Sequence, residues 1–142
     1  MQALLASPHA SAGVTFGDVP DPRPKPDQVL IEVELFPIVA RALDHAATLP
    51  AGSVPGSDAV GTVVHPAADG SGPAVGTRVA TLGTSAAWAR LRAVPTDELA
   101  VVPEGSTSSR AVGSHCWMAS APGGTPSSRS RGVCVARTLR AG

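Results

Sequence analysis

The chain has 142 residues, a formal net charge of zero and 43% hydrophobic residues, while aromatic residues make up only 3%. Its 15 glycines and 14 prolines interrupt helices too often for a helix bundle. The balanced charge argues against a general nucleic-acid binder, and no apolar run reaches the roughly 18 residues of a membrane-spanning helix. Met1–Ala6 lacks the basic start and long apolar stretch of a secretory signal, so we expect a cytoplasmic protein.

Charge divides the chain into two regions. All eleven acidic residues and six of the eleven basic ones lie in residues 1–105, which therefore carry a net charge of −5. Residues 106–142 contain five arginines, no acid and no strand or helix periodicity, which predicts a solvated, disordered basic tail. We expect its two cysteines, Cys116 and Cys134, to be unpaired thiols. A disulfide, a metal site or a nucleic-acid-binding role for the tail are the alternatives.

Short apolar runs separated by turn residues fill residues 1–105, a pattern typical of a β-sandwich or a partly open barrel. In Gln28–Leu35 apolar and acidic residues alternate, as in a half-buried strand. Three prolines within 22–26 cannot pair in a central strand and predict an extended connector. A short helix is expected at Ala40–Thr48. The expected strands are Gln2–Ala6, Val14–Val19, Gln28–Leu35, Val60–His65, Val75–Leu82, Ala87–Val94 and Leu99–Val102.

Several phrases of this region occur in the order known from one family. After the opening strand and the prolines come QVLIEVEL at 28–35, VPGSDAVGTVV at 54–64, AVGTRVA at 74–80, WAR at 88–90 and AVPTDELAVVPEG at 93–105. Together they resemble the N-terminal GroES-like domain of the medium-chain dehydrogenases/reductases. The resemblance covers residues 1–105 and implies a mainly β fold: a partly open barrel with one or two short helices.

Three glycines in these phrases, Gly56, Gly61 and Gly76, lie where the backbone turns sharply or approaches another segment closely. We expect turn and packing roles for them, and direct contact with a ligand is the alternative.

The residues at the positions of the family's zinc ligands indicate which branch of the family this chain resembles. Zinc-dependent members have a cysteine where this chain has Arg41 and a His-Glu pair where it has Ser57 and Asp58, and no cysteine precedes Cys116. An arginine stays protonated and cannot ligate a metal. The chain therefore resembles the zinc-independent quinone oxidoreductases and enoyl reductases, and no metal is expected. This resemblance implies NADPH as the cofactor of full-length relatives, and a quinone or conjugated carbonyl as their substrate.

The resemblance makes four residues candidates for the substrate cleft: Arg41, Asp44, Ser57 and Asp58. Zinc-free relatives often have Asn-Pro at the positions of Arg41 and Ala42, where the asparagine helps to hold the nicotinamide end and the substrate. Either the cofactor contact is made differently here, or Arg41 binds a negatively charged group of the substrate. The alternatives are that Arg41 is a surface residue, that Asp44 braces its loop, and that Ser57 and Asp58 make hydrogen bonds where a strand begins. Catalytic and cofactor-binding residues remain unassigned.

The Rossmann domain that follows the barrel in complete members has no counterpart in this sequence. No G-x-G-x-x-G turn follows an expected strand, so we expect no tight NADPH binding by this chain. The resemblance stops near Gly105, where Ser106–Ser109 replaces the helix of the family. Codons for Val-Asp-Leu read out of register can encode Ser-Thr-Ser. Our hypothesis is that 106–142 is a frameshift product or truncation; an intact frame on resequencing, with no Rossmann sequence in phase downstream, would refute it.

The sequence therefore predicts a truncated, NADPH-dependent, zinc-independent oxidoreductase that supplies the substrate-side domain and is inactive alone. The alternative is a non-enzymatic GroES-like barrel that binds another protein, as a scaffold or co-chaperonin-like module. No nucleic-acid or membrane partner is expected, and the resemblance allows a homodimer among full-length relatives. Apolar surface that relatives bury against their second domain would lie in water here, which predicts marginal stability.

Overall fold

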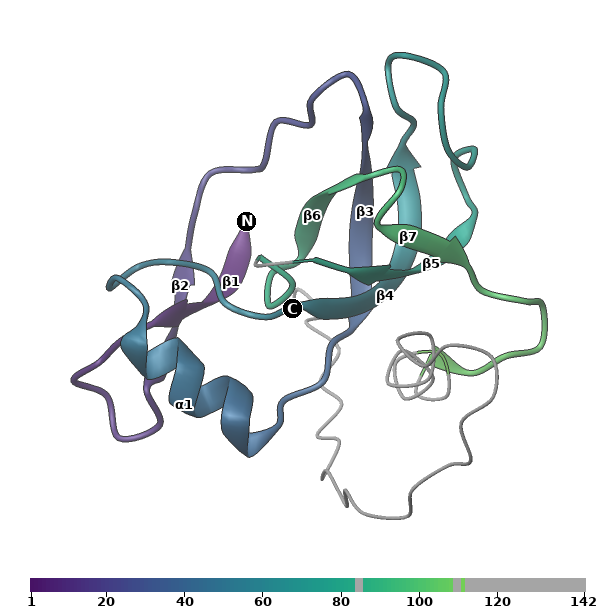
Figure 1. Ribbon diagram of the computed structural model, residues 1–142. Helices are drawn as coiled ribbons and strands as arrows, with labels where there is room; N and C mark the ends of the chain where they lie inside the picture. Colours follow the sequence, from purple (N-terminus) through teal and green to yellow (C-terminus); the bar gives the residue numbers. More distant parts are fainter. Residues whose placement is uncertain (84–85, 109–110, 112–142) are drawn as a thin grey trace.

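The computed structural model describes residues 1–83, 86–108 and 111, and this part of the chain is mainly β (Figure 1). A single nine-residue helix, α1, accompanies seven strands in these residues. The elements in chain order are β1 Gln2–Ala6, β2 Val14–Asp18, β3 Gln28–Leu35, α1 Ala40–Thr48, β4 Asp58–His65, β5 Arg78–Leu82, β6 Leu91–Pro95 and β7 Leu99–Val101.

The strands form two antiparallel sheets. One is the β1–β2 pair, and the other has the strand order β6-β3-β4-β5-β7. Figure 1 shows the larger sheet curving into a half-barrel, with β1, β2 and α1 beside it. A single bridge between Ala3 and Ala89 connects β1 to the segment before β6. The partly open barrel predicted from the sequence is confirmed.

The main core lies on the inner face of the curved sheet. In β3 the alternate residues Val29, Ile31 and Val33 are buried, which is the period of two that predicted this strand. Adjacent residues of β4 and β5 point to opposite faces, so that Val60 and Ala80 belong to a second, smaller apolar cluster on the outer face. The sheet therefore has apolar contacts on both sides.

Most expected elements are confirmed, and at three boundaries the difference is larger than one residue. Strand β3 and helix α1 have the predicted bounds, whereas β4 begins earlier, at Asp58. Residues 75–77 were expected to be strand but form a turn, because Gly76 has a φ of +87°. Residues 87–90 also lack a continuous ladder, since their backbone groups bond to several separate segments. The extended proline connector is confirmed, since no strand or helix is assigned over residues 19–25.

Gly61 shows the close approach that the sequence predicted. A Cβ atom at this position of β4 would overlap the carbonyl of Glu32 on β3. Any larger residue would therefore push the two central strands apart.

Most of the expected tail, including Cys116 and Cys134, lies outside the described residues. Within them, no helix has the length and apolar character needed to cross a membrane.

Candidate functional site

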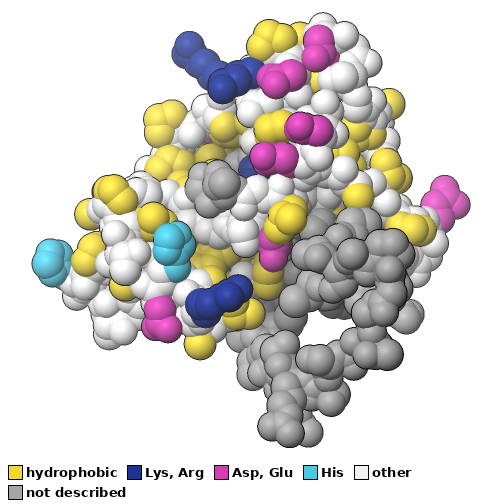
Figure 2. All heavy atoms as spheres, in the orientation of Figure 1, with side chains coloured by type: hydrophobic (Ala, Val, Ile, Leu, Met, Phe, Trp, Pro, Cys, Tyr) yellow, Lys and Arg dark blue, Asp and Glu magenta, His cyan; other side chains and the backbone are white. Residues whose placement is uncertain are grey.

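Helix α1 carries two of the four candidate residues, Arg41 and Asp44. Ala46 is buried in the main core and Leu43 packs against it, whereas Arg41 and Asp44 are both exposed. Figure 2 shows charged side chains of both signs and histidines on this end of the molecule. The expected bracing role of Asp44 finds no support, because within the described residues its side chain makes no hydrogen bond or ion pair and α1 has no side-chain cap.

The other two candidates, Ser57 and Asp58, lie where β4 begins. Ser57 is exposed, and its carbonyl accepts a hydrogen bond from the amide of Gly83 at 3.0 Å. Asp58 is half-buried, and its Oδ1 atom is enclosed without a hydrogen-bond partner among the described residues. Backbone contacts therefore hold this part of the site, and one oxygen of the Asp58 carboxylate is buried.

A buried arginine, Arg92, explains the environment of Asp58. Arg92 is 3% exposed, and its Nη1 donates to Thr81 Oγ1 at 2.8 Å. Thr81 in turn donates to the carbonyl of Ala59 at 3.2 Å. Burial lowers the pKa of Arg92, and the negative charges of Asp58 and Glu98 oppose that shift. Asp58 is thus one of the counter-charges of a cation inside the barrel.

Arg92 also fixes the segment that bonds to Ser57. A Cβ atom on Gly83 would lie 2.5 Å from Arg92 Nη2 and 3.0 Å from Glu98 Oε2. The guanidinium therefore packs directly against the Gly83 backbone, whose amide bonds to Ser57. Arg92 is thereby linked to Ser57 through Gly83.

Trp88 joins the two halves of the candidate site. Its indole is 1% exposed, stacks with Phe36 at a centroid distance of 6.2 Å, and donates from Nε1 to the carbonyl of Pro37 at 3.2 Å. Its backbone amide donates to Pro55 at 3.0 Å. Pro37 leads into α1 and Pro55 leads into β4. Trp88 therefore contacts the start of both segments, the one that carries Arg41 and the one that carries Ser57.

Gly56 is required beside Trp88 for two reasons. Its φ is +94°, a conformation that disfavours residues with a side chain. A Cβ atom there would also overlap the indole ring. The packing role expected for Gly56 is therefore confirmed.

Two buried residues that the sequence analysis did not select, Trp88 and Arg92, contact the segments next to the candidate residues. A signal for Arg92 was present, because it pairs with the buried Ile31 of β3 and precedes the buried Val94 by two residues. An arginine on the inward face of a strand needs counter-charges, and these are Asp58 and Glu98. No group of His, Cys, Asp or Glu side chains among the described residues could hold a metal ion, and His45 and His65 are exposed.

Neither the protein-family models nor the curated proteins give a match to this chain. Solved structures do match, and they include quinone oxidoreductases and an alcohol dehydrogenase superfamily protein. The predicted resemblance is therefore confirmed at the level of the fold.

Three of these structures define the comparison. A probable oxidoreductase from Mycobacterium abscessus is 25% identical with a TM-score of 0.69, covering 80% of this chain and 38% of its own. The quinone oxidoreductase from Thermus thermophilus, also solved in complex with NADPH, is 26% identical with a TM-score of 0.60, covering 79% and 36%. The human synaptic vesicle membrane protein VAT-1 homolog-like protein is 20% identical with a TM-score of 0.72, covering 79% and 38%. This chain thus spans less than two fifths of the length of each.

Proposed function

We propose that residues 1–105 form the substrate-side half of an NADPH-dependent, zinc-independent oxidoreductase that reduces a quinone or a conjugated carbonyl. The observation that carries the proposal is the match of the half-barrel, at 25–26% identity, to an oxidoreductase and a quinone oxidoreductase. We further propose that residues 106–142 are a frameshift product or truncation of such an enzyme.

The described residues do not fit the pyrophosphate of NADPH. A dinucleotide is held by orphan amides at a helix N-terminus that follows a strand and a glycine-rich turn. Helix α1 follows Pro37, Ile38 and Val39 instead, and the amides of Ala42 and Leu43 in its first turn already bond to the Val39 carbonyl. The nucleotide therefore needs a second domain.

The part that this chain supplies is one wall of the reaction site. Hydride transfer needs donor and acceptor carbons held in contact and away from water. The buried Trp88 bonds to Pro37 and Pro55, in the segments that lead to Arg41 and Ser57, and the buried Arg92 packs against Gly83, whose amide bonds to Ser57. Exposed Arg41 would attract an anionic group of a substrate, and exposed Ser57 offers a hydroxyl donor to a carbonyl oxygen.

The assay that tests this proposal mixes the purified chain with NADPH and a series of quinones and follows NADPH oxidation. The chain alone is expected to give no turnover above the uncatalysed rate and no saturable NADPH binding. NADPH-dependent turnover by this chain would overturn the proposal that a second domain is needed to bind NADPH.

A further inference from the structure

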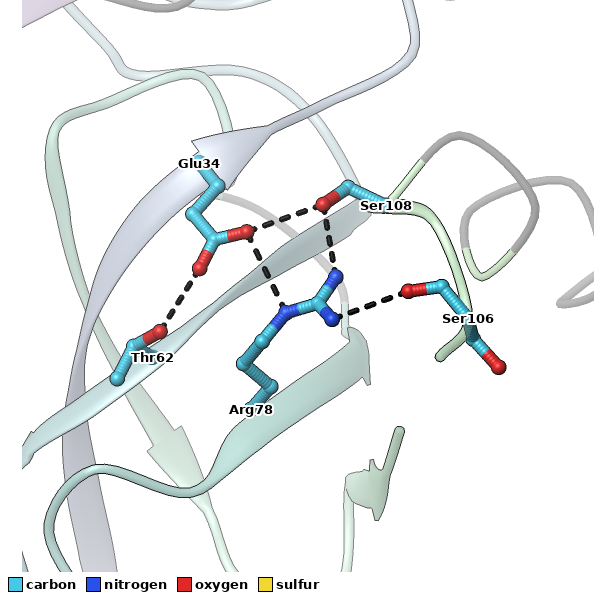
Figure 3. A network of polar contacts seen from close by, with 5 residues as sticks. All are labelled: Glu34, Thr62, Arg78, Ser106 and Ser108. Atoms are coloured by element: carbon cyan, nitrogen blue, oxygen red, sulfur yellow. Dashed lines mark hydrogen bonds and ion pairs between the residues drawn. The ribbon is translucent and has the colours of Figure 1, made fainter. Parts of the chain in front are cut away.

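The outer face of the half-barrel carries a polar cluster from three adjacent strands (Figure 3). Glu34 on β3 accepts a hydrogen bond from Thr62 Oγ1 on β4 at 2.8 Å. Its other carboxylate oxygen lies 3.6 Å from Nε of Arg78 on β5. Both charged side chains are about one-third exposed, at 37% and 33%. The sheet thus presents a carboxylate and a guanidinium side by side.

The segment after β7 closes on this pair. Arg78 donates from Nη1 to the Ser106 carbonyl at 3.0 Å and from Nη2 to Ser108 Oγ at 2.9 Å. Ser108 Oγ donates to Glu34 Oε2 at 3.0 Å. Figure 3 shows the Ser108 hydroxyl between the two charged groups. The carbonyl contact at 106 is open to any residue, whereas the double contact at 108 requires a side chain that both donates and accepts.

An apolar contact accompanies the polar one. Ala111 is 8% exposed and belongs to the outer cluster with Val60, Ala80 and Val102, against which Leu35 also packs. The Ala111 amide donates to the Thr107 carbonyl at 3.1 Å, so Ala111 is bonded to the residue between Ser106 and Ser108. The sequence predicted solvated residues from 106 onward, but Ser106, Ser108 and Ala111 all contact the barrel.

We propose that Ser106–Ser108 and Ala111 form a latch that covers the outer apolar cluster, and that the Ser108 hydroxyl between Glu34 and Arg78 keeps it closed. The packed domain then reaches Ala111 rather than ending at Gly105. The latch contacts are few and partly exposed, so it opens at a lower free energy than the buried inner core. An open latch leaves Val60, Ala80 and Val102 in water. This proposal does not depend on the proposed oxidoreductase role.

Amide hydrogen exchange of the full chain, followed by NMR, tests the latch through two matched pairs of variants. Ser108→Ala removes the bridging hydroxyl, whereas Ser106→Ala leaves the backbone carbonyl that Arg78 uses. The Ala111 amide should exchange about threefold to tenfold faster in Ser108→Ala, because the hydroxyl loses its partly exposed hydrogen bonds with both Glu34 and Arg78. It should be unchanged in Ser106→Ala. The Val33 amide of β3, which donates to the Arg90 carbonyl, should keep its exchange rate in both variants.

The second pair approaches the latch from the sheet. Glu34→Gln removes the ion pair with Arg78, and Glu32→Gln removes a charge at an exposed position of the same strand. Faster Ala111 exchange in Glu34→Gln, with no change in Glu32→Gln, supports the latch. Equal exchange within either pair, or an Ala111 amide that exchanges at the unprotected rate in the unaltered chain, would overturn it.

Discussion

Two regions hold separate segments together by opposite means. One is the junction around Trp88, which contacts Phe36, Pro55 and Gly56, and the other is the latch around Ser108. At the junction, a buried indole, a left-handed glycine and backbone hydrogen bonds leave no space for another side chain. At the latch, an ion pair that is about one-third exposed and hydroxyl contacts hold a short segment against the sheet. Substitutions at the junction should therefore affect the stability of the whole fold, while those at the latch should affect only local opening.

The largest effect is expected at Gly56, which lies against the Trp88 indole. Gly56→Ala combines a positive φ, which costs about 1–2 kcal/mol, with an overlap that costs about 1–3 kcal/mol more. Gly52→Ala is the matched control, because Gly52 has a φ of +84° but a Cβ atom there would have no neighbour within 4 Å. Urea denaturation gives both free energies of unfolding. Equal losses of unfolding free energy in Gly56→Ala and Gly52→Ala would show that the indole is not what requires glycine at position 56.

A smaller effect is expected from neutralising the buried cation. Arg92→Met fills similar space but leaves the charges of Asp58 and Glu98 uncompensated, which should lower the free energy of unfolding by about 1–3 kcal/mol. Arg90→Met is the control, because the buried Nε of Arg90 makes no hydrogen bond with the described residues. If the two variants lose the same stability in urea, Arg92 is not the internal counter-charge of Asp58.

The smallest effect concerns the exposed turn between β4 and β5. Asp69 accepts hydrogen bonds from the hydroxyl and amide of Ser71 at 2.6 and 2.8 Å, and these lower the pKa of its carboxyl. A lowered folded-state pKa adds stability above the unfolded-state value, which is lost as the pH falls through the folded-state value. Asp69→Asn should therefore be slightly less stable than the unaltered chain at neutral pH. The difference should shrink below about pH 4, as measured by thermal melting across pH; a difference that grows there contradicts the assignment.

The fold was more predictable from the sequence than the site. Alternation in Gln28–Leu35 and the helix stop signal Leu49-Pro50-Ala51-Gly52 after Ala40–Thr48 are local signals, and both elements have their predicted bounds. Arg92 and Asp58 lie on strands that are distant in sequence, and a pattern along one strand does not reveal that the charge of Asp58 stabilises the charged form of Arg92. The same is true of Ser108, whose neighbours Glu34 and Arg78 come from two other strands.

The central claim is that this half-barrel is the substrate side of a two-domain reductase. The most direct measurement joins residues 1–111 to the nucleotide-binding domain of the Thermus thermophilus quinone oxidoreductase and follows NADPH oxidation with quinones. We predict NADPH-dependent quinone reduction by the fusion, and a weakened preference for anionic over neutral quinones in its Arg41→Ala variant. A folded, NADPH-binding fusion that reduces no quinone or conjugated carbonyl would contradict the claim.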